Sequence, residues 1–139
     1  MAIVKCNDYE KDLLARIMRA EALGEGNLGM LMVGNVVVNR VISDCLNFNT
    51  VTSINDAIYQ KNQFSGINNS LFYSNPTTKE KELADKIIKG EYFHPASNAL
   101  WFKASMDVCQ NTWYNQPLAG RYKNHCFYNP LSESCRMIH

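Results

Sequence analysis

The apolar positions near the start of the chain follow helical spacing, and the pattern contains one polar exception. A helix is predicted for residues 9–22, with an apolar stripe that consists of Leu14, Ile17 and Met18. The next position of this stripe, seven residues after Leu14, is Glu21. A glycine-containing segment then interrupts the helical pattern. The sequence therefore places a carboxylate on the buried face of the last helical turn.

Burial would give Glu21 unusual acid–base chemistry. An apolar environment disfavours the charged form of a carboxyl group and raises its pKa, and the negative end of the helix dipole acts in the same direction. A glutamate with a raised pKa can donate a proton near neutral pH, so Glu21 is our candidate catalytic acid. The alternative is that Glu21 lies at the edge of the stripe and pairs with Arg16 or Arg40.

A second helix is predicted for residues 28–43, where apolar residues lie on nearly every side. A helix of this kind is buried at the centre of a domain. The valines of the segment favour extended structure, so a buried strand over residues 30–38 is the competing interpretation. The polar exceptions Asn35 and Asn39 are four residues apart and therefore share one face of the predicted helix.

Capping residues indicate two further helices. Ser53 predicts the start of a short helix. Thr77 and Glu80 form a capping-box pattern, and Gly90 predicts the end of the helix that follows. Between these helices, residues 61–76 are rich in Asn, Ser and Gly and predict a long irregular segment, which is a frequent location for functional residues.

The second half of the chain has a different pattern. Aromatic and β-prone segments at residues 99–103 and 122–128, joined through residues 113–120, predict a small antiparallel sheet. Helices followed by strands predict an α+β fold, with a cleft where the two parts meet. At 139 residues the chain is expected to form one domain, residues 1–139.

Charge and hydropathy narrow the classes of partner. The net charge is +1 without runs of like sign, which argues against strong binding to nucleic acid or to a membrane surface. No segment approaches the roughly 20 apolar residues that span a bilayer, and the N-terminus lacks the apolar core of a signal peptide. We therefore expect a protein made in the cytosol without a standard export signal.

The five cysteines are an odd number without CxxC spacing, which argues against a zinc site or a full disulfide framework. We expect reduced and mostly buried thiols, although one pair could oxidise outside a living cytoplasm. His125 cannot activate its neighbour Cys126, because adjacent residues of a strand point to opposite faces. The remaining thiol alternative is Cys109 paired in space with His125 or His94.

Cofactor chemistry has little support in the sequence. Glycines 24 and 26 precede a helix, but the GxxxxGK[ST] pattern of a phosphate-binding loop does not follow. The histidines at positions 94, 125 and 139 lack metal-ligand spacing, so no metal site is predicted. A hard cation such as calcium could still bind Glu25, Asp107 or loop carbonyls without leaving a sequence signature.

The aromatic residues of the second half suit a polysaccharide cleft, because sugar faces stack on aromatic rings and sugar hydroxyls hydrogen-bond to amide side chains. The rings concerned are Trp101, Trp113, Tyr114, Tyr122 and Tyr128. The alternative is that each of these rings packs in the core. The combination with Glu21 favours the cleft.

Several segments together resemble a known family. Residues 13–40 read LLARIMRAEALGEGNLGMLMVGNVVVNR and resemble the signature of the bacterial spore cortex-lytic enzymes, the SleB/CwlJ-type cell wall hydrolases. That signature runs from a helix through Ala-Glu-Ala-x-Gly-Glu to a valine-rich helix ending in Asn-Arg. The resemblance continues, in order, at residues 63–65 (QFS), 99–102 (ALWF), 116–117 (QP) and 120–128 (GRYKNHCFY).

This resemblance implies a lysozyme-like or lytic-transglycosylase-like fold with one catalytic glutamate, Glu21, and with Glu25 as the second acid of the motif. It implies action on cortex peptidoglycan during germination. The short CwlJ-like branch is the most similar, which implies a protein laid down in the spore coat, at the outer boundary of the cortex. A coat protein would be its partner, and calcium a reasonable requirement.

We expect the substrate to contact six further residues: Gln63, Ser65, Asn39, His125, Trp101 and Tyr128. Asn39 could equally cap helix backbone, Gln63 could brace a loop and His125 could be a packed strand residue. Two other functions stay open at this point. One is a coat-bound structural or binding protein of the same fold that depends on a partner, and the other is a cysteine-dependent peptidoglycan peptidase.

Overall fold

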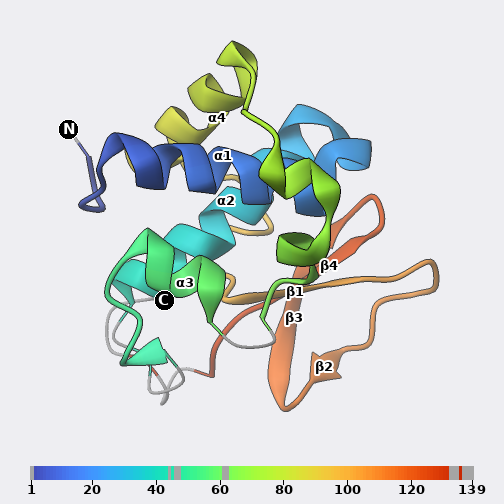
Figure 1. The fold of residues 1–139 in the computed structure, drawn as a ribbon. Coiled ribbons are helices and arrows are strands. Elements are labelled where there is room, and N and C mark those ends of the chain that lie inside the picture. The colour runs from blue at the N-terminus through green and yellow to red at the C-terminus, as the bar shows by residue number, and fades with distance from the viewer. Residues whose placement is uncertain (1, 44, 46–47, 61–62, 132–134, 136–139) are drawn as a thin grey trace.

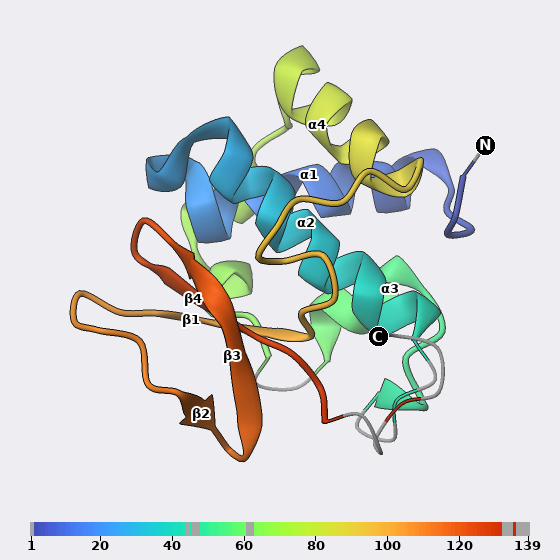
Figure 2. The ribbon, with the colours of Figure 1, turned by 180° about the vertical axis from the view of Figure 1, so that it is seen from behind.

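The structure is a computed structural model that describes residues 2–43, 45, 48–60, 63–131 and 135 (Figure 1). Its helices are α1 (Asp8–Ala22), α2 (Gly26–Ile42), α3 (Ile54–Tyr59) and α4 (Thr78–Ile88), with the 3₁₀ turns η1 (Leu23–Glu25), η3 (Ser65–Asn68) and η4 (Ser70–Tyr73). Its strands are β1 (Trp101–Ala104), β2 (Thr112–Trp113), β3 (Gln116–Tyr122) and β4 (His125–Tyr128). The predicted α+β class is confirmed, with the helices gathered on one side of the small sheet (Figures 1 and 2).

Helix α1 matches the predicted helix and begins at a capping box. The Glu10 N–H donates to Asn7 Oδ1 at 2.8 Å, while the Asn7 N–H donates to Glu10 Oε1 at 3.4 Å. These bonds satisfy backbone donors that the first helical turn leaves without partners. The predicted apolar stripe is buried, with exposed fractions of 1% or less. Glu21, which continues the stripe, lies one residue before the helix ends and is partly buried.

Helix α2 is the centre of the fold, and the alternative of a strand over residues 30–38 is wrong. The described side chains from Met30 to Arg40 are all buried. A Cβ added at Gly34 would lie 2.9 Å from Ile87 Cγ1 and 3.0 Å from Met18 Sδ. Neighbouring helices therefore approach α2 closely on this side, and burial all round outweighs the weak helix propensity of the valines.

The other two helices start where the capping residues predict. Ser53 Oγ accepts the Asp56 N–H at 3.0 Å at the start of α3. At the start of α4, Thr77 Oγ1 accepts the Glu80 N–H at 3.1 Å, and Glu80 Oε1 accepts the Thr77 N–H at 2.8 Å. Gly90 follows the end of α4 with φ +97°, the left-handed conformation that glycine adopts most readily.

A buried arginine organises the segment between α3 and α4. Arg19 forms an ion pair of 2.8 Å with Glu80 and donates to three backbone carbonyls, those of Leu71, Ser74 and Asn75. Side-chain exposure is only 8% for Arg19 and 10% for Glu80. The segment predicted to be irregular therefore contains two 3₁₀ turns that are fastened to α1 and α4. Part of the prediction, at residues 61 and 62, lies outside the described residues.

The predicted antiparallel sheet is confirmed, with the strand order β1-β4-β3-β2. Its strand bounds differ from the prediction, because most of the predicted connection belongs to β3 and the turn between β3 and β4 divides residues 122–128. Trp101 pairs with Tyr128 and Ala104 with His125, so β4 lies between β1 and β3. All four residues of β4 are buried, because both faces of this central strand are covered. Phe127 packs against α2, while Cys126 and Tyr128 on the other face contact Cys109 and Trp113. No helix in the described ranges is long and apolar enough to cross a membrane.

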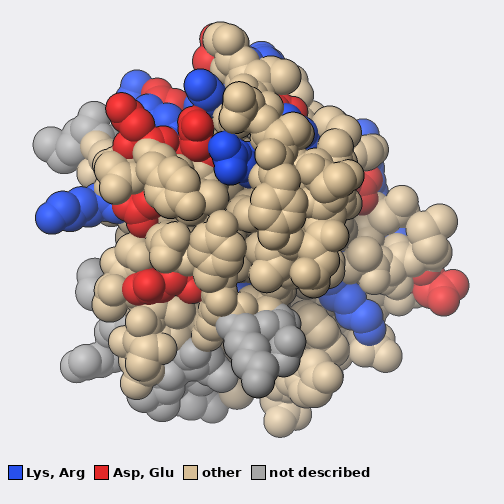
Figure 3. Space-filling model, viewed as in Figure 1, with Lys and Arg blue, Asp and Glu red and all other residues tan. Residues whose placement is uncertain are grey.

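The expectation of reduced thiols is wrong. Two disulfides are present, Cys45 to Cys135 and Cys109 to Cys126, and Cys6 is the remaining free cysteine. The paired residues are 90 and 17 positions apart, so only the folded chain brings them together. The odd number of cysteines and the lack of short-range spacing therefore gave no indication of either disulfide. Figure 3 shows charged side chains of both signs interspersed on the face drawn, in keeping with the low net charge.

Candidate active site

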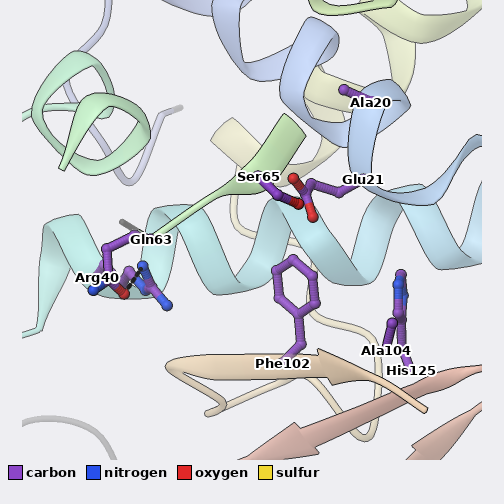
Figure 4. Close-up of a pocket in the computed structure, with 8 residues that line it drawn as sticks. All are labelled: Ala20, Glu21, Arg40, Gln63, Ser65, Phe102, Ala104 and His125. Atoms are coloured by element: carbon purple, nitrogen blue, oxygen red, sulfur yellow. Dashed lines mark hydrogen bonds between the residues drawn. The ribbon is translucent and has the colours of Figure 1, made fainter. Parts of the chain in front are cut away.

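A cavity of about 400 Å³ lies where the helical part meets the sheet, as the α+β pattern predicts. The end of α1, the segment that leads into η3, and strands β1 and β4 contribute its walls (Figure 4). Its lining residues are Ala20, Glu21, Arg40, Gln63, Ser65, Phe102, Ala104 and His125. Glu21 is the only acid among the described residues that line this cavity. Four of the predicted site residues are therefore brought together: Glu21, Gln63, Ser65 and His125.

The Glu21 carboxylate points into the cavity from the last turn of α1 (Figure 4). Burial raises the pKa of Glu21, and the hydrogen bond that Glu21 Oε2 accepts from the Gly66 N–H opposes the rise. No ion pair links Glu21 to Arg16 or Arg40, so the alternative of a structural ion pair is not realised for these residues. Glu21 has the environment of a proton donor.

Gly66 is a part of the site that the sequence reasoning missed. A Cβ at position 66 would lie 2.5 Å from Glu21 Oε2 and 3.0 Å from both Ala20 Cβ and Ile17 Cδ1. Only a residue without a Cβ lets the backbone N–H reach the carboxylate from this direction. Gly66 directly follows the Gln63-Phe64-Ser65 motif, and this position in the sequence could have identified it as a site residue.

Ser65 and Gln63 occupy different ends of the same wall. The Ser65 side chain lies beside the Glu21 carboxylate, whereas Gln63 lies near Arg40 (Figure 4). Gln63 Oε1 accepts a hydrogen bond of 3.0 Å from Arg40 Nη1. Both Ser65 and Gln63 are exposed, so their remaining polar atoms are accessible from the cavity.

His125 and Phe102 form the floor of the cavity, with ring centroids 5.2 Å apart (Figure 4). His125 is only 5% exposed. Burial lowers the pKa of His125, and the charge of Glu25 opposes this effect. His125 Nδ1 is buried and has no hydrogen-bond partner among the described groups. The His125 ring therefore lines the cavity, while its Nδ1 is shielded from the open space.

Glu25, the second acid of the motif, does not line the cavity. Its Oε1 accepts the Asn124 N–H at 3.0 Å, and its backbone carbonyl accepts from Lys123 Nζ at 3.1 Å. The 3₁₀ turn η1 is thereby fastened to the turn between β3 and β4. Glu25 is 8% exposed and acts as a brace between the two parts of the fold.

A second cavity of about 350 Å³ continues the first. The two share Arg40, Gln63 and Phe102, and the second is also lined by Trp101, Trp113 and Tyr114. Together they form one cleft, which we call the aromatic cleft, with Glu21 at one end and the rings of Trp113 and Tyr114 at the other. Trp101 is therefore in the cleft, as predicted.

Two predicted contact residues lie elsewhere. Asn39 is 1% exposed, and its Nδ2 donates to the carbonyls of Ala96, Ser97 and Ala99 at 2.9–3.3 Å. Asn39 therefore holds the segment before β1 and cannot contact a ligand in the aromatic cleft. Tyr128 is also 1% exposed and donates its hydroxyl to the Gln110 carbonyl at 3.0 Å. Both residues are structural because their polar atoms already have partners.

The thiol alternative is excluded by the disulfides. Cys109 is bonded to Cys126, so no free thiol is available there to His125 or His94. Within the described ranges, no group of three or more His, Cys, Asp or Glu side chains is arranged to hold a metal ion. Asp107 is exposed, and its backbone carbonyl accepts a hydrogen bond from Arg121 Nη1.

Known proteins resemble this chain in sequence and in fold. The model of the Cell Wall Hydrolase family matches residues 24–128. Cell wall hydrolase CwlJ of Oceanobacillus iheyensis is 48% identical, over 97% of this chain and 96% of the relative. Cell wall hydrolase CwlJ of Bacillus subtilis is 41% identical, over 100% of this chain and 98% of the relative.

Two solved structures have the same fold. The catalytic domain of the Bacillus cereus SleB protein has a TM-score of 0.71 and 22% identity, over 90% of this chain and 93% of that chain. The catalytic domain of the germination-specific lytic transglycosylase SleB from Bacillus anthracis has a TM-score of 0.70, also at 22% identity, over 89% and 97%. These matches confirm the expected lysozyme-like fold. The family match and the extent of the sequence identity together show that this chain belongs to the cell wall hydrolase family.

Proposed function

We propose that this protein cleaves the glycan strands of spore cortex peptidoglycan, at the bond between muramic acid and glucosamine, with Glu21 as the catalytic acid. In this proposal residues 1–139 act as one catalytic domain. The observation that carries the proposal is the position of Glu21. It is the only acid among the described residues of the cavity, and burial raises its pKa.

A single acid favours a reaction in which the substrate supplies the nucleophile. Hydrolytic glycosidases generally use two carboxyl groups that are about 5–9.5 Å apart. In the proposed lytic transglycosylase reaction, Glu21 donates its proton to the glycosidic oxygen as the bond from muramic C1 breaks. Glu21 then accepts the proton of the muramic 6-hydroxyl, whose oxygen bonds to C1 and closes an anhydro ring. The proton count balances, and no water is consumed.

The cleft offers polar groups that suit a sugar chain. The exposed amide of Gln63 and hydroxyl of Ser65 are available to sugar hydroxyls, and the His125 ring lines the same cavity. Trp101 supplies an aromatic surface in the second part of the cleft. We assign these residues to substrate binding and orientation.

The substitution Glu21→Gln tests the catalytic role. Gln keeps the shape of the side chain but cannot donate an acidic proton, so we expect at least a 100-fold loss of activity on purified cortex peptidoglycan. Glu82→Gln is the matched control, because Glu82 is exposed on α4 and outside the cleft. Unchanged activity of Glu21→Gln would remove Glu21 as the acid and would favour a binding protein that depends on a partner.

Mass spectrometry of the released muropeptides tests the bond and the chemistry together. Transglycosylation produces anhydro-muramic ends, which are lighter by one water molecule than the reducing ends produced by hydrolysis. Muramic reducing ends without anhydro forms would refute the internal attack while leaving Glu21 as the acid. Glucosamine reducing ends would refute the proposed bond.

The proposed place of action is the spore coat, at the outer boundary of the cortex, during germination. Support comes from the CwlJ names of the relatives and from the germination-specific description of one SleB neighbour. Extraction of coat proteins from dormant spores tests this location. Recovery of the protein in the decoated spore core and its absence from the coat extract would contradict it.

A further inference from the structure

Arg40 is a buried cation in the wall of the aromatic cleft. The residue is 2% exposed, and its guanidinium carbon lies 4.7 Å from the ring centroid of Phe48 and 4.8 Å from that of Phe64. Aromatic rings therefore cover the planar guanidinium, and its polar partners must approach its edge. A planar edge with several N–H groups is the geometry that binds a carboxylate with two hydrogen bonds.

Within the described chain, Arg40 donates few hydrogen bonds, and their acceptors are uncharged. Nε donates to the Leu100 carbonyl at 2.7 Å, and Nη1 donates to Gln63 Oε1 at 3.0 Å. No carboxylate of the described residues forms an ion pair with Arg40. Burial lowers the pKa of Arg40 to about 9, because the charged guanidinium loses its hydration.

Arg19 provides an internal comparison. It is also buried, at 6% exposure, but it is paired with Glu80 and surrounded by backbone carbonyls. A buried charge without an anionic partner is costly, which is why such charges are usually paired. Arg40 differs from Arg19 in that it lines a cavity, so its partner can be a ligand.

The surroundings of Arg40 specify what that ligand must carry. Arg40 lies where the two parts of the aromatic cleft join, and no acidic residue among those described lines the second part. Lys103 Nζ lies 5.7 Å from the ring centroid of Trp113, one of the rings that line the second part. Rings for stacking and an unpaired cation together suit a sugar that bears an acidic group.

We infer that Arg40 binds a carboxylate of the substrate and so makes the cleft selective for an acid-bearing sugar beside the one that Glu21 protonates. The inference rests on the proposed function and deepens it. In peptidoglycan the carboxylate has two sources. It is the lactyl carboxylate of a muramic residue without a peptide, or the α-carboxylate of the first amino acid attached to that lactyl group.

The test measures binding by the Glu21→Gln protein, so that the ligand is not cleaved. The three ligands are tetrasaccharides of alternating N-acetylglucosamine and N-acetylmuramic acid. Their lactyl groups are free carboxylates, neutral methylamides, or amides of L-alanine with a free α-carboxylate. Quenching of tryptophan fluorescence reports binding, because Trp101 and Trp113 line the cleft. We expect the favoured carboxylate ligand to bind at least about tenfold more tightly than the methylamide.

The relative affinity of the two acidic ligands identifies the source of the carboxylate. Equal affinity for the methylamide and both acids, or no binding of any ligand, would overturn the inference. The proposed function is tested separately by the unmodified protein. Selective binding without cleavage would refute the glycosidase activity alone, and cleavage without selectivity would refute the role of Arg40 alone.

Gln63→Glu tests whether Arg40 is the source of the selectivity. The new carboxylate is isosteric with the amide that Arg40 already contacts, so it would pair with the cation and compete with the ligand. We expect the preference for the acidic ligand to fall to about twofold or less in this variant. Gln110→Glu is the matched control, because Gln110 is exposed and outside the aromatic cleft. If both variants kept the same preference for the acidic ligand, that result would overturn the inference.

Discussion

The contact between Gly66 and Glu21 makes Gly66→Ala the sharpest test of how the acid is positioned. The added Cβ would lie 2.5 Å from Glu21 Oε2, whereas ordinary van der Waals contact begins at 3.4 Å. Ala20 and Ile17 are each 3.0 Å away on the other sides, so the methyl group cannot move aside freely. The Glu21 carboxylate must therefore retreat by roughly 1 Å and lose the Gly66 N–H as a donor.

The magnitude follows from this displacement. A misplacement of about 1 Å in a catalytic group costs on the order of 100-fold in rate. Overpacking of a tight contact costs about 1–3 kcal/mol of unfolding free energy. At about 2–4 °C per kcal/mol for a chain near this length, the Gly66→Ala protein should still be folded at 25 °C. We therefore expect a loss of activity that exceeds the loss of stability.

The assay compares Gly66→Ala with Gly24→Ala, a control near the same site. A Cβ at Gly24 would have no atom within 4 Å, so this variant should keep its activity within about twofold. Initial rates on cortex peptidoglycan and thermal unfolding are measured for both proteins. Activity of Gly66→Ala within twofold of Gly24→Ala would refute the idea that Gly66 positions the acid.

Three further predictions concern stability. Burial raises the pKa of Glu21, so the folded state holds this proton more tightly than the unfolded state. The free energy of unfolding should therefore fall as the pH rises from the ordinary glutamate pKa through the raised one. In urea titrations Glu21→Gln should flatten this pH dependence, and an unchanged pH dependence would contradict the burial of Glu21. Glu80→Gln should cost about 3–5 kcal/mol in the same assay because it leaves Arg19 buried without its counter-ion, and a loss below 1 kcal/mol would disprove that dependence. Replacing Cys109 and Cys126 together by alanine should cost about 3 kcal/mol, as expected for opening a loop of 17 residues, and equal stability with and without the bond would contradict it.

Local patterns were enough to predict the helices and to single out Glu21 as the candidate acid. The capping residues Ser53 and Thr77 act on donors within the next helical turn, so their effect does not depend on the rest of the fold. The periodicity that placed Glu21 beside buried residues is also local, because one helical face is defined by spacing alone. The family resemblance added the substrate class and the expected fold.

Other features depend on contacts between distant segments, and no local pattern predicts them. Asn39 shares a face with Asn35, but its three carbonyl partners come from residues about sixty positions later, which is why it is a brace and not a ligand contact. The same is true of the disulfide between Cys45 and Cys135, which are 90 positions apart.

The sequence by itself determined the helices and the presence of an antiparallel sheet, and it singled out Glu21 as the candidate acid, because spacing and capping act over a few residues. Only the tertiary structure decided what surrounds the acid. Gly66 reaches Glu21 from 45 positions away, and Arg40 donates a hydrogen bond to Gln63, which is 23 positions later. The proton affinity of Glu21 and the charge of the cleft arise from burial and neighbouring groups, which exist only once distant segments have packed together.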